Sequence, residues 1–166
     1  MCGLAGMLLP APAREQAALE EQARRMGDAL VHRGPDDSGV WADASAGIAL
    51  AHRRLSILDL SPLGHQPMTS ADGRYVLAYN GEVYNFAELR AELEALRHGF
   101  RGHSDTEVLL AAITEWGFDE TLQRTNCMFA IALWARAPRL LWLAPDPLCT
   151  KPPYSGRAGA TLLFGP

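Results

Sequence analysis

The sequence has only three cysteines among 166 residues, Cys2, Cys127 and Cys149. No two of them form a Cys-x-x-Cys pair, and any disulfide pairing would leave one over. Small secreted domains that depend on disulfides have many more cysteines for their length. We therefore expect a protein of a reducing compartment, the cytoplasm.

Long apolar runs and blocks of basic residues are missing as well. The apolar start, residues 2–9, has no positively charged segment before it and is followed by Pro10 and Pro12, so it predicts neither a signal peptide nor a membrane span. The 15 basic and 19 acidic residues are interspersed, with no polybasic block that would neutralise a phosphate backbone. Neither a membrane nor a nucleic acid is an expected partner.

The sequence also lacks a cluster of histidines and cysteines of the kind that holds a metal. The five histidines do not cluster with the cysteines at the spacing of metal ligands. We therefore expect no metal site and no cofactor in this chain. No internal repeat or low-complexity segment is present, which favours a single domain.

Apolar residues, by contrast, make up 48% of the chain, enough for one domain to bury a core. Segments of strand length and segments of helical spacing follow one another and predict a mixed α+β domain. The expected strands cover residues 4–9, 40–41, 47–52, 75–79, 129–134, 140–143 and 161–164, and the expected helices cover residues 14–30, 86–96 and 105–116.

Local signals predict where some of these elements end. Asn80-Gly81 is a favoured pair for a tight turn with positive backbone dihedrals, so we expect the strand at residues 75–79 to break there. Asn85 and Ser104 are followed three residues later by glutamate, a spacing that predicts helix caps. Little chain follows residues 161–164, so we expect that strand to lie at an exposed sheet edge and the chain to be a fragment.

A cysteine directly follows the initiator methionine. It is small enough for the methionine to be removed, after which the thiol and the α-amino group belong to the same residue. An α-amino group titrates at about 7.7 to 8.0 and a thiol near 8.5, so the amine can accept the thiol proton near neutrality. Cys2 is therefore a candidate nucleophile, although a cysteine at this position is more often incidental.

Five segments carry a family resemblance. They are residues 1–6 (MCGLAG), 32–41 (HRGPDDSGVW), 51–59 (AHRRLSILD), 79–85 (YNGEVYN) and 102–107 (GHSDTE). In this order and spacing they resemble the glutaminase domain of glutamine-hydrolysing asparagine synthetases, a class II amidotransferase domain of the N-terminal nucleophile hydrolase type. The resemblance implies a four-layer αββα sandwich of two mostly antiparallel sheets over residues 1–166, incomplete at its C-terminus.

The resemblance also implies a reaction. Glutamine is hydrolysed to glutamate and ammonia through a γ-glutamyl thioester on Cys2, which is the ammonia-supplying half of asparagine synthesis from aspartate. The tetrahedral oxyanion of this reaction needs preorganised donors, and the implied donors are the Asn80 side chain and the Gly81 backbone amide. The loop at residues 32–36 is implied to approach the nucleophile without a chemical step of its own.

Glutamine is a zwitterion, so its pocket needs a cation and an anion. The resemblance implies Arg54 for the α-carboxylate, Asp105 for the α-ammonium group and Glu82 beside them. Without the resemblance, Arg54 would be a solvated charge at a strand edge and Asp105 a residue favoured by a helix dipole.

The implied partners are glutamine and a synthetase domain in cis or in trans that uses the ammonia. ATP and Mg²⁺ are implied only for that synthetase domain, which is absent from this chain. Related amidotransferases of sugar phosphates share the N-terminal cysteine, but residues 51–68 and 79–93 resemble the asparagine synthetase branch more closely. The acceptor carboxylate and a homodimeric assembly stay open.

Three positions depart from the family pattern. Cys127 and Cys149 replace glycines, and Pro145 replaces an arginine. A proline beside a strand removes a ladder donor, and a cysteine that must adopt a positive φ costs roughly 1–2 kcal/mol. These departures keep a second hypothesis open, a catalytically silent domain that only binds glutamine or a partner.

Overall fold

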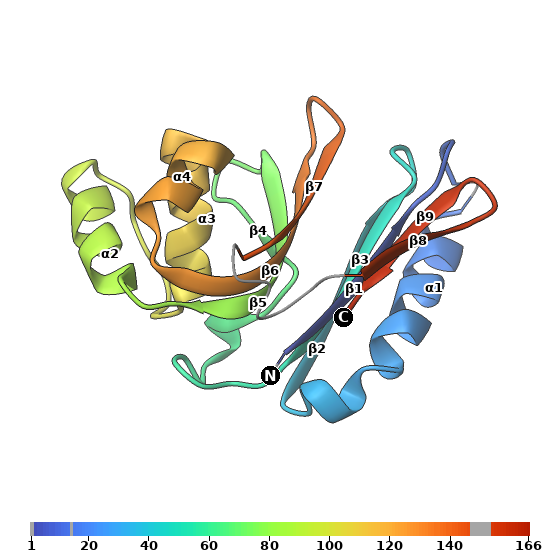
Figure 1. The fold of residues 1–166 in the computed structure, drawn as a ribbon, viewed down its shortest axis with the longest axis horizontal. Coiled ribbons are helices and arrows are strands. Elements are labelled where there is room, and N and C mark those ends of the chain that lie inside the picture. The colour runs from blue at the N-terminus through green and yellow to red at the C-terminus, as the bar shows by residue number, and fades with distance from the viewer. Residues whose placement is uncertain (1, 14, 147–153) are drawn as a thin grey trace.

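Two antiparallel sheets face each other in the centre of the molecule, and helices cover both outer faces (Figure 1). The computed structural model describes residues 2–13, 15–146 and 154–166. One helix, α1 (Gln16–Asp28), packs on the five-stranded sheet, whereas α2 (Phe86–Ala95), α3 (Asp105–Trp116) and α4 (Phe118–Arg124) lie on the outer side of the four-stranded sheet. This four-layer αββα arrangement confirms the expected fold class.

The five-stranded sheet has the strand order β2-β3-β1-β9-β8. Its strands are β1 (Gly3–Leu8), β2 (Asp37–Asp43), β3 (Ile48–Arg54), β8 (Tyr154–Ala158) and β9 (Thr161–Gly165). The expectation that the last strand lies at an exposed edge is wrong, because β9 pairs with β1 on one side and with β8 on the other. Gly6 faces Phe164 in that register, and a Cβ at Gly6 would lie 2.3 Å from the Phe164 ring.

The four-stranded sheet has the order β4-β5-β6-β7. Its strands are β4 (Met68–Thr69), β5 (Tyr75–Val83), β6 (Cys127–Ala135) and β7 (Leu140–Pro145). The expected turn at Asn80-Gly81 is wrong, because β5 runs straight through both residues and pairs with β6 over its whole length. Neither residue has a positive φ. Long-range pairing thus overrides a local turn preference.

Pro145 costs this sheet no ladder bond, contrary to the expectation. The Asp146 amide donates to the Phe129 carbonyl at 2.9 Å, which makes these two residues a hydrogen-bonded pair. The neighbouring pair, Ala130 with Pro145, is then a non-hydrogen-bonded pair, so the proline nitrogen points away from β6. The expected strain is also absent at Cys127, which has no positive φ, whereas Cys149 lies outside the described residues.

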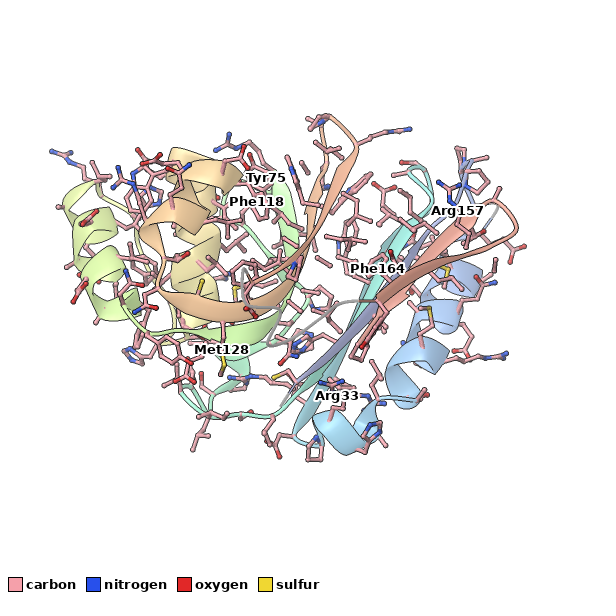
Figure 2. All side chains as sticks on the ribbon, viewed as in Figure 1. Arg33, Tyr75, Phe118, Met128, Arg157 and Phe164 are labelled. Carbon is pink, nitrogen blue, oxygen red and sulfur yellow. The ribbon has the colours of Figure 1, made fainter. Side chains whose placement is uncertain are left out.

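Alternation along the strands divides the core into three layers. Between the sheets lie Leu4, Ile48, Leu50, Val76, Ala78, Trp134 and Phe164, the last of which Figure 2 shows on β9. The other face of β5 carries Leu77 and Tyr79 against helices α2 and α3. Met7, Ala49 and Ala51 pack against α1 through Leu19 and Ala23. No helix in the described part of the chain is long and apolar enough to cross a membrane.

One of the two predicted helix caps is present. The Ser104 hydroxyl accepts from the Glu107 amide at 3.2 Å and caps α3 as expected. Asn85 does not cap α2, because its side chain instead donates to the Arg124 carbonyl and accepts from the Asn126 amide. Its two polar groups are thus used in a long-range contact between the start of α2 and the start of β6.

Candidate active site

A single cavity of about 240 Å³ brings together all six residues that the sequence singled out, Cys2, Arg54, Asn80, Gly81, Glu82 and Asp105. These residues come from β3, β5 and the first turn of α3, together with Cys2, the residue before β1. Met128, which Figure 2 labels in the lower part of the view, lines the same cavity. The structure therefore places the proposed nucleophile and the proposed substrate ligands around one space.

The Cys2 thiol lines this cavity and is held by Leu55, the residue that follows β3. Its sulfur accepts from the Leu55 amide at 3.3 Å and donates to the Leu55 carbonyl at 3.6 Å. Cys2 directly precedes β1, and the pairing of Gly3 with Arg53 continues towards Arg54. The register of β1 on β3 thus places the thiol next to the proposed carboxylate ligand.

An open edge of β5 forms the floor of the cavity. Just beyond the ends of β5 and β6, the Tyr84 amide donates to the Asn126 carbonyl at 2.8 Å and continues their register. Alternation therefore turns the amides of Tyr79, Gly81 and Val83 away from β6. The short strand β4 pairs only with Val76 and Leu77 and does not reach this part of β5.

The backbone amides of Tyr79 and Val83, two residues before and after Gly81, donate hydrogen bonds to side chains. The Tyr79 amide donates to Gln66 Oε1 at 2.7 Å, and the Val83 amide donates to Asp105 Oδ2 at 3.0 Å. The Gly81 amide lies between them and faces the cavity, as an oxyanion donor must. A side chain does not fit at Gly81, because a Cβ would lie 2.3 Å from the Met128 carbonyl.

Arg54 is a buried cation in the wall of the cavity, with 7% of its surface exposed. Its guanidinium donates through Nη1 to the Ser61 carbonyl at 2.9 Å and through Nη2 to the Asp59 carbonyl. A Cβ at Gly64 would lie 2.0 Å from Nη2, so only glycine leaves room for the guanidinium here. The segment after β3 therefore fixes the direction in which Arg54 presents its remaining donors.

Asp105 supplies the opposite charge at the first turn of α3. Burial raises the pKa of its carboxyl group, the hydrogen bond from the Val83 amide opposes that shift, and the nearby charge of Glu82 adds to it. A buried carboxylate with a raised pKa favours a cationic partner, because such a partner stabilises the ionised form. The cavity thus has a cation, Arg54, and an anion, Asp105, in its wall.

The loop at residues 34–36, which precedes β2, packs against the end of β3 and the residues that follow it. The Asp36 amide donates to the Arg54 carbonyl at 3.0 Å, and the Asp36 carboxylate accepts from the Ser56 amide at 2.8 Å. Gly34 packs so closely that a Cβ would lie 2.4 Å from the Arg53 carbonyl. The loop therefore braces the segment that holds the Cys2 thiol, and none of its residues lines the cavity.

Sequence reasoning missed several residues of the site. Gln66, Gly64 and Asp59 all line the cavity, and Gly64 and Asp59 contact Arg54. Gln66 bridges β5 and α3, because its Oε1 accepts from Tyr79 and its Nε2 donates to Thr106 Oγ1 at 3.4 Å. In the sequence, these three residues are marked only by their position within residues 51–68. That segment resembles the family as a whole and does not single out individual positions.

His52 ties the two sheets together below the cavity. Its Nε2 donates to the Tyr79 carbonyl at 2.9 Å, and only 1% of its surface is exposed. Burial lowers the pKa of His52 from 6.5 to about 4, so the ring is neutral at pH 7. The histidine therefore holds β5 in place as a neutral donor.

Comparison with known proteins decides the family. A model described as a glutamine amidotransferase domain matches residues 1–166. The chain belongs to the glutamine amidotransferase family. Among curated relatives, this amidotransferase chain is 40% identical over 168 residues to glutamine-hydrolyzing asparagine synthetase 3 of Bacillus subtilis (strain 168), an overlap that covers 99% of the chain and 26% of that protein.

A second relative agrees. The amidotransferase chain is 41% identical over 138 residues to glutamine-hydrolyzing asparagine synthetase B of Escherichia coli (strain K12), covering 83% of the chain and 24% of that protein. The chain thus spans about a quarter of the length of these relatives. The predicted resemblance to the glutaminase domain of asparagine synthetases is confirmed.

A solved structure supports the fold of the amidotransferase independently. Glutamine phosphoribosylpyrophosphate amidotransferase from B. subtilis, complexed with ADP and GMP, superposes with a TM-score of 0.80 over 99% of this chain and 41% of that one. The two sequences are only 20% identical, so this likeness bears on the fold alone.

Proposed function

We propose that the chain hydrolyses L-glutamine to L-glutamate and ammonia. The thiolate of Cys2 attacks the side-chain amide carbon, ammonia leaves, and water then cleaves the γ-glutamyl thioester. The observation that carries this proposal is the Gly81 amide, which has no hydrogen-bond partner within residues 2–13, 15–146 and 154–166 and faces the same cavity as the Cys2 thiol. A nucleophile and an oxyanion donor on one cavity are what acyl transfer requires.

The substrate assignment follows from the charges in the cavity wall. Arg54 and Asp105 provide one cation and one anion, which match the α-carboxylate and the α-ammonium group of an amino acid. Asn80 adds a side-chain amide near the reacting carbon, and Glu82 lines the wall beside Asp105. A dicarboxylate would leave Asp105 without a partner, and a neutral amide would leave both charges without one.

The base is the α-amino group of Cys2 itself. It becomes free once Met1 has been removed, and it takes the thiol proton and later delivers a proton to the departing ammonia. The thiol must stay reduced, so we propose that the reaction takes place in the cytoplasm. Hydrolysis by this route uses no metal and no cofactor.

The fate of the ammonia is the next part of the proposal. The relatives are named glutamine-hydrolyzing asparagine synthetases, and the chain covers about a quarter of each. We propose that the ammonia serves asparagine synthesis on a synthetase domain, joined to this chain or bound to it, and that ATP and Mg²⁺ belong to that second step.

Release of glutamate from glutamine by a chain that begins at Cys2 tests the first step. We expect glutamate and ammonia in equal amounts, and γ-glutamyl hydroxamate when hydroxylamine replaces water in cleaving the thioester. Cys2→Ala is the control and should show neither product. A folded chain that binds glutamine without releasing glutamate would refute hydrolysis and support the silent binding domain instead.

A further inference from the structure

The two charges that would hold the ends of glutamine come from separate parts of the fold. Arg54 lies at the end of β3, and Asp105 begins α3. A ligand that contacts both is held well only if the distance between them is fixed. Asp59 is a charged side chain that connects the two parts; it is 7% exposed and lines the cavity.

On the Arg54 side, Asp59 shapes the segment that receives the guanidinium. Its Oδ1 accepts from the Ser61 amide at 2.8 Å. The carbonyl groups of these same two residues, Asp59 and Ser61, accept the two hydrogen bonds from Arg54. The Asp59 carboxylate thus stabilises the turn at residues 59–61, and the carbonyl groups of this turn orient the Arg54 guanidinium.

On the other side, Asp59 holds the entry to α3. Its Oδ2 accepts from the His103 amide at 2.8 Å, two residues before Asp105. The two amides before His103, those of Arg101 and Gly102, donate to the Glu107 carboxylate of α3 itself. The hydrogen bond from the His103 amide to Asp59 therefore joins this turn to the segment around Arg54.

The charge state of Asp59 suits this bridge. Hydrogen bonds from Ser61 and from the His103 amide lower the pKa of its carboxyl group to about 2, so it is ionised at neutral pH. A carboxylate accepts at both oxygens, whereas an asparagine accepts at only one. Gly102 leaves little space beside it, because a Cβ there would lie 3.0 Å from Asp59 Oδ2.

We infer that Asp59 is a positioning residue that sets the distance between Arg54 and Asp105 and so makes the site selective for α-amino acid zwitterions. The inference rests on the proposed function, since it assumes that these two residues hold one glutamine molecule. The Asp59 carboxylate accepts hydrogen bonds from the Ser61 and His103 amides, and no hydrogen bond in the described part of the chain joins it to Cys2. Loss of the Asp59 carboxylate should therefore weaken the binding of ligands that carry both charges more than the binding of ligands that carry one.

Binding to a Cys2→Ala chain measures this selectivity without depending on turnover. The two ligands are L-glutamine and glutaramate, which is glutamine without its α-ammonium group, and the affinities come from NMR titrations. Asp59→Asn should weaken the binding of glutamine by about 10-fold or more, the equivalent of one charge-assisted hydrogen bond. It should weaken the binding of glutaramate by less than about 3-fold.

A matched control is Asp72→Asn. Asp72 accepts from the Arg74 amide at 3.0 Å and from the Ser70 hydroxyl at 2.7 Å, and hydrogen bonds lower the pKa of its carboxyl group to about 2 despite partial burial. It holds a turn of the same kind outside the cavity, so its substitution should leave both affinities unchanged. Gly102→Ala is the second test, because it crowds Asp59 Oδ2 without changing a charge, and it should lower the selectivity by about 3-fold.

The outcomes separate the two proposals. If Asp59→Asn weakens the binding of glutamine and of glutaramate equally, or leaves both affinities unchanged, Asp59 does not have this role. If that variant does not fold, the selectivity of Gly102→Ala decides in the same way. Glutamine binding to Cys2→Ala without glutamate release by the unmodified chain would instead refute hydrolysis and leave the test of Asp59 in place.

Discussion

A single added methyl group at Gly64 should weaken glutamine binding without touching the chemistry. The Cβ of Gly64→Ala would lie 2.0 Å from Nη2 of Arg54 and 2.5 Å from its Cζ, so the guanidinium must move away. Gly64 has no positive φ, and alanine therefore fits the backbone itself. The substitution therefore changes the direction in which the Arg54 guanidinium points.

The size of the effect follows from the hydrogen bonds involved. A hydrogen bond to a charged group contributes about 1.5–3 kcal/mol, so loss of the grip on the α-carboxylate should raise KM roughly 10- to 150-fold. The Ser61 and Asp59 carbonyls also lose their donor, which should lower the free energy of unfolding by about 1–3 kcal/mol. Saturated turnover should stay within about 3-fold, because Cys2 and Gly81 are unchanged.

Initial rates of glutamate release across a range of glutamine concentrations separate KM from kcat. The control is Gly99→Ala, since a Cβ at Gly99 meets nothing within 4 Å. A Gly64→Ala chain that keeps the KM of the parent would refute the assignment of Arg54 as the carboxylate ligand. A fall in kcat with an unchanged KM would contradict it equally.

Two further predictions concern buried ionisable groups. Burial lowers the pKa of His52 from 6.5 to about 4, so between those pH values the unfolded chain binds more protons than the folded one. The free energy of unfolding should therefore fall by about 3 kcal/mol as the pH drops from 7 to 4, and urea titrations of His52→Gln should lack this part of the slope. Burial raises the pKa of Asp105, so its ionised form costs stability at pH 7. Asp105→Asn keeps an acceptor for Val83 and should be at least as stable in the same titrations, while KM for glutamine rises about 10-fold or more; a variant with an unchanged KM would contradict its role.

Much of the site was predictable because its residues lie in recognisable segments. The motif at residues 79–85 and the cysteine after Met1 identified the proposed oxyanion donors and nucleophile, and the structure brings them to one cavity. Their neighbours Asp59 and Gln66 were not predictable, because their contacts lie across the fold. Asp59 bonds to His103, and Gln66 bonds to Tyr79 and Thr106.

The errors in the fold have the same origin. Asn80-Gly81 was predicted as a turn from its local preference, yet nine consecutive residue pairs with β6 hold it extended. Asn85 was predicted as a cap, yet its amide bonds near the start of β6. The elements β4 and β8 show no apolar pattern, because β4 has two residues and every residue of β8 is exposed, and α4 has only seven residues, so packing defines these elements.

The position of β9 next to β1 has a consequence for synthesis on the ribosome. The strand that begins directly after the proposed nucleophile is made first, and the partner that pairs Phe164 with Gly6 is made last of the described strands. At 5–20 residues per second, β1 waits roughly 8–30 s for that partner. A nascent chain therefore lacks an intact sheet beneath Cys2 until the described residues have left the ribosome, and we expect glutaminase activity only after release of that segment.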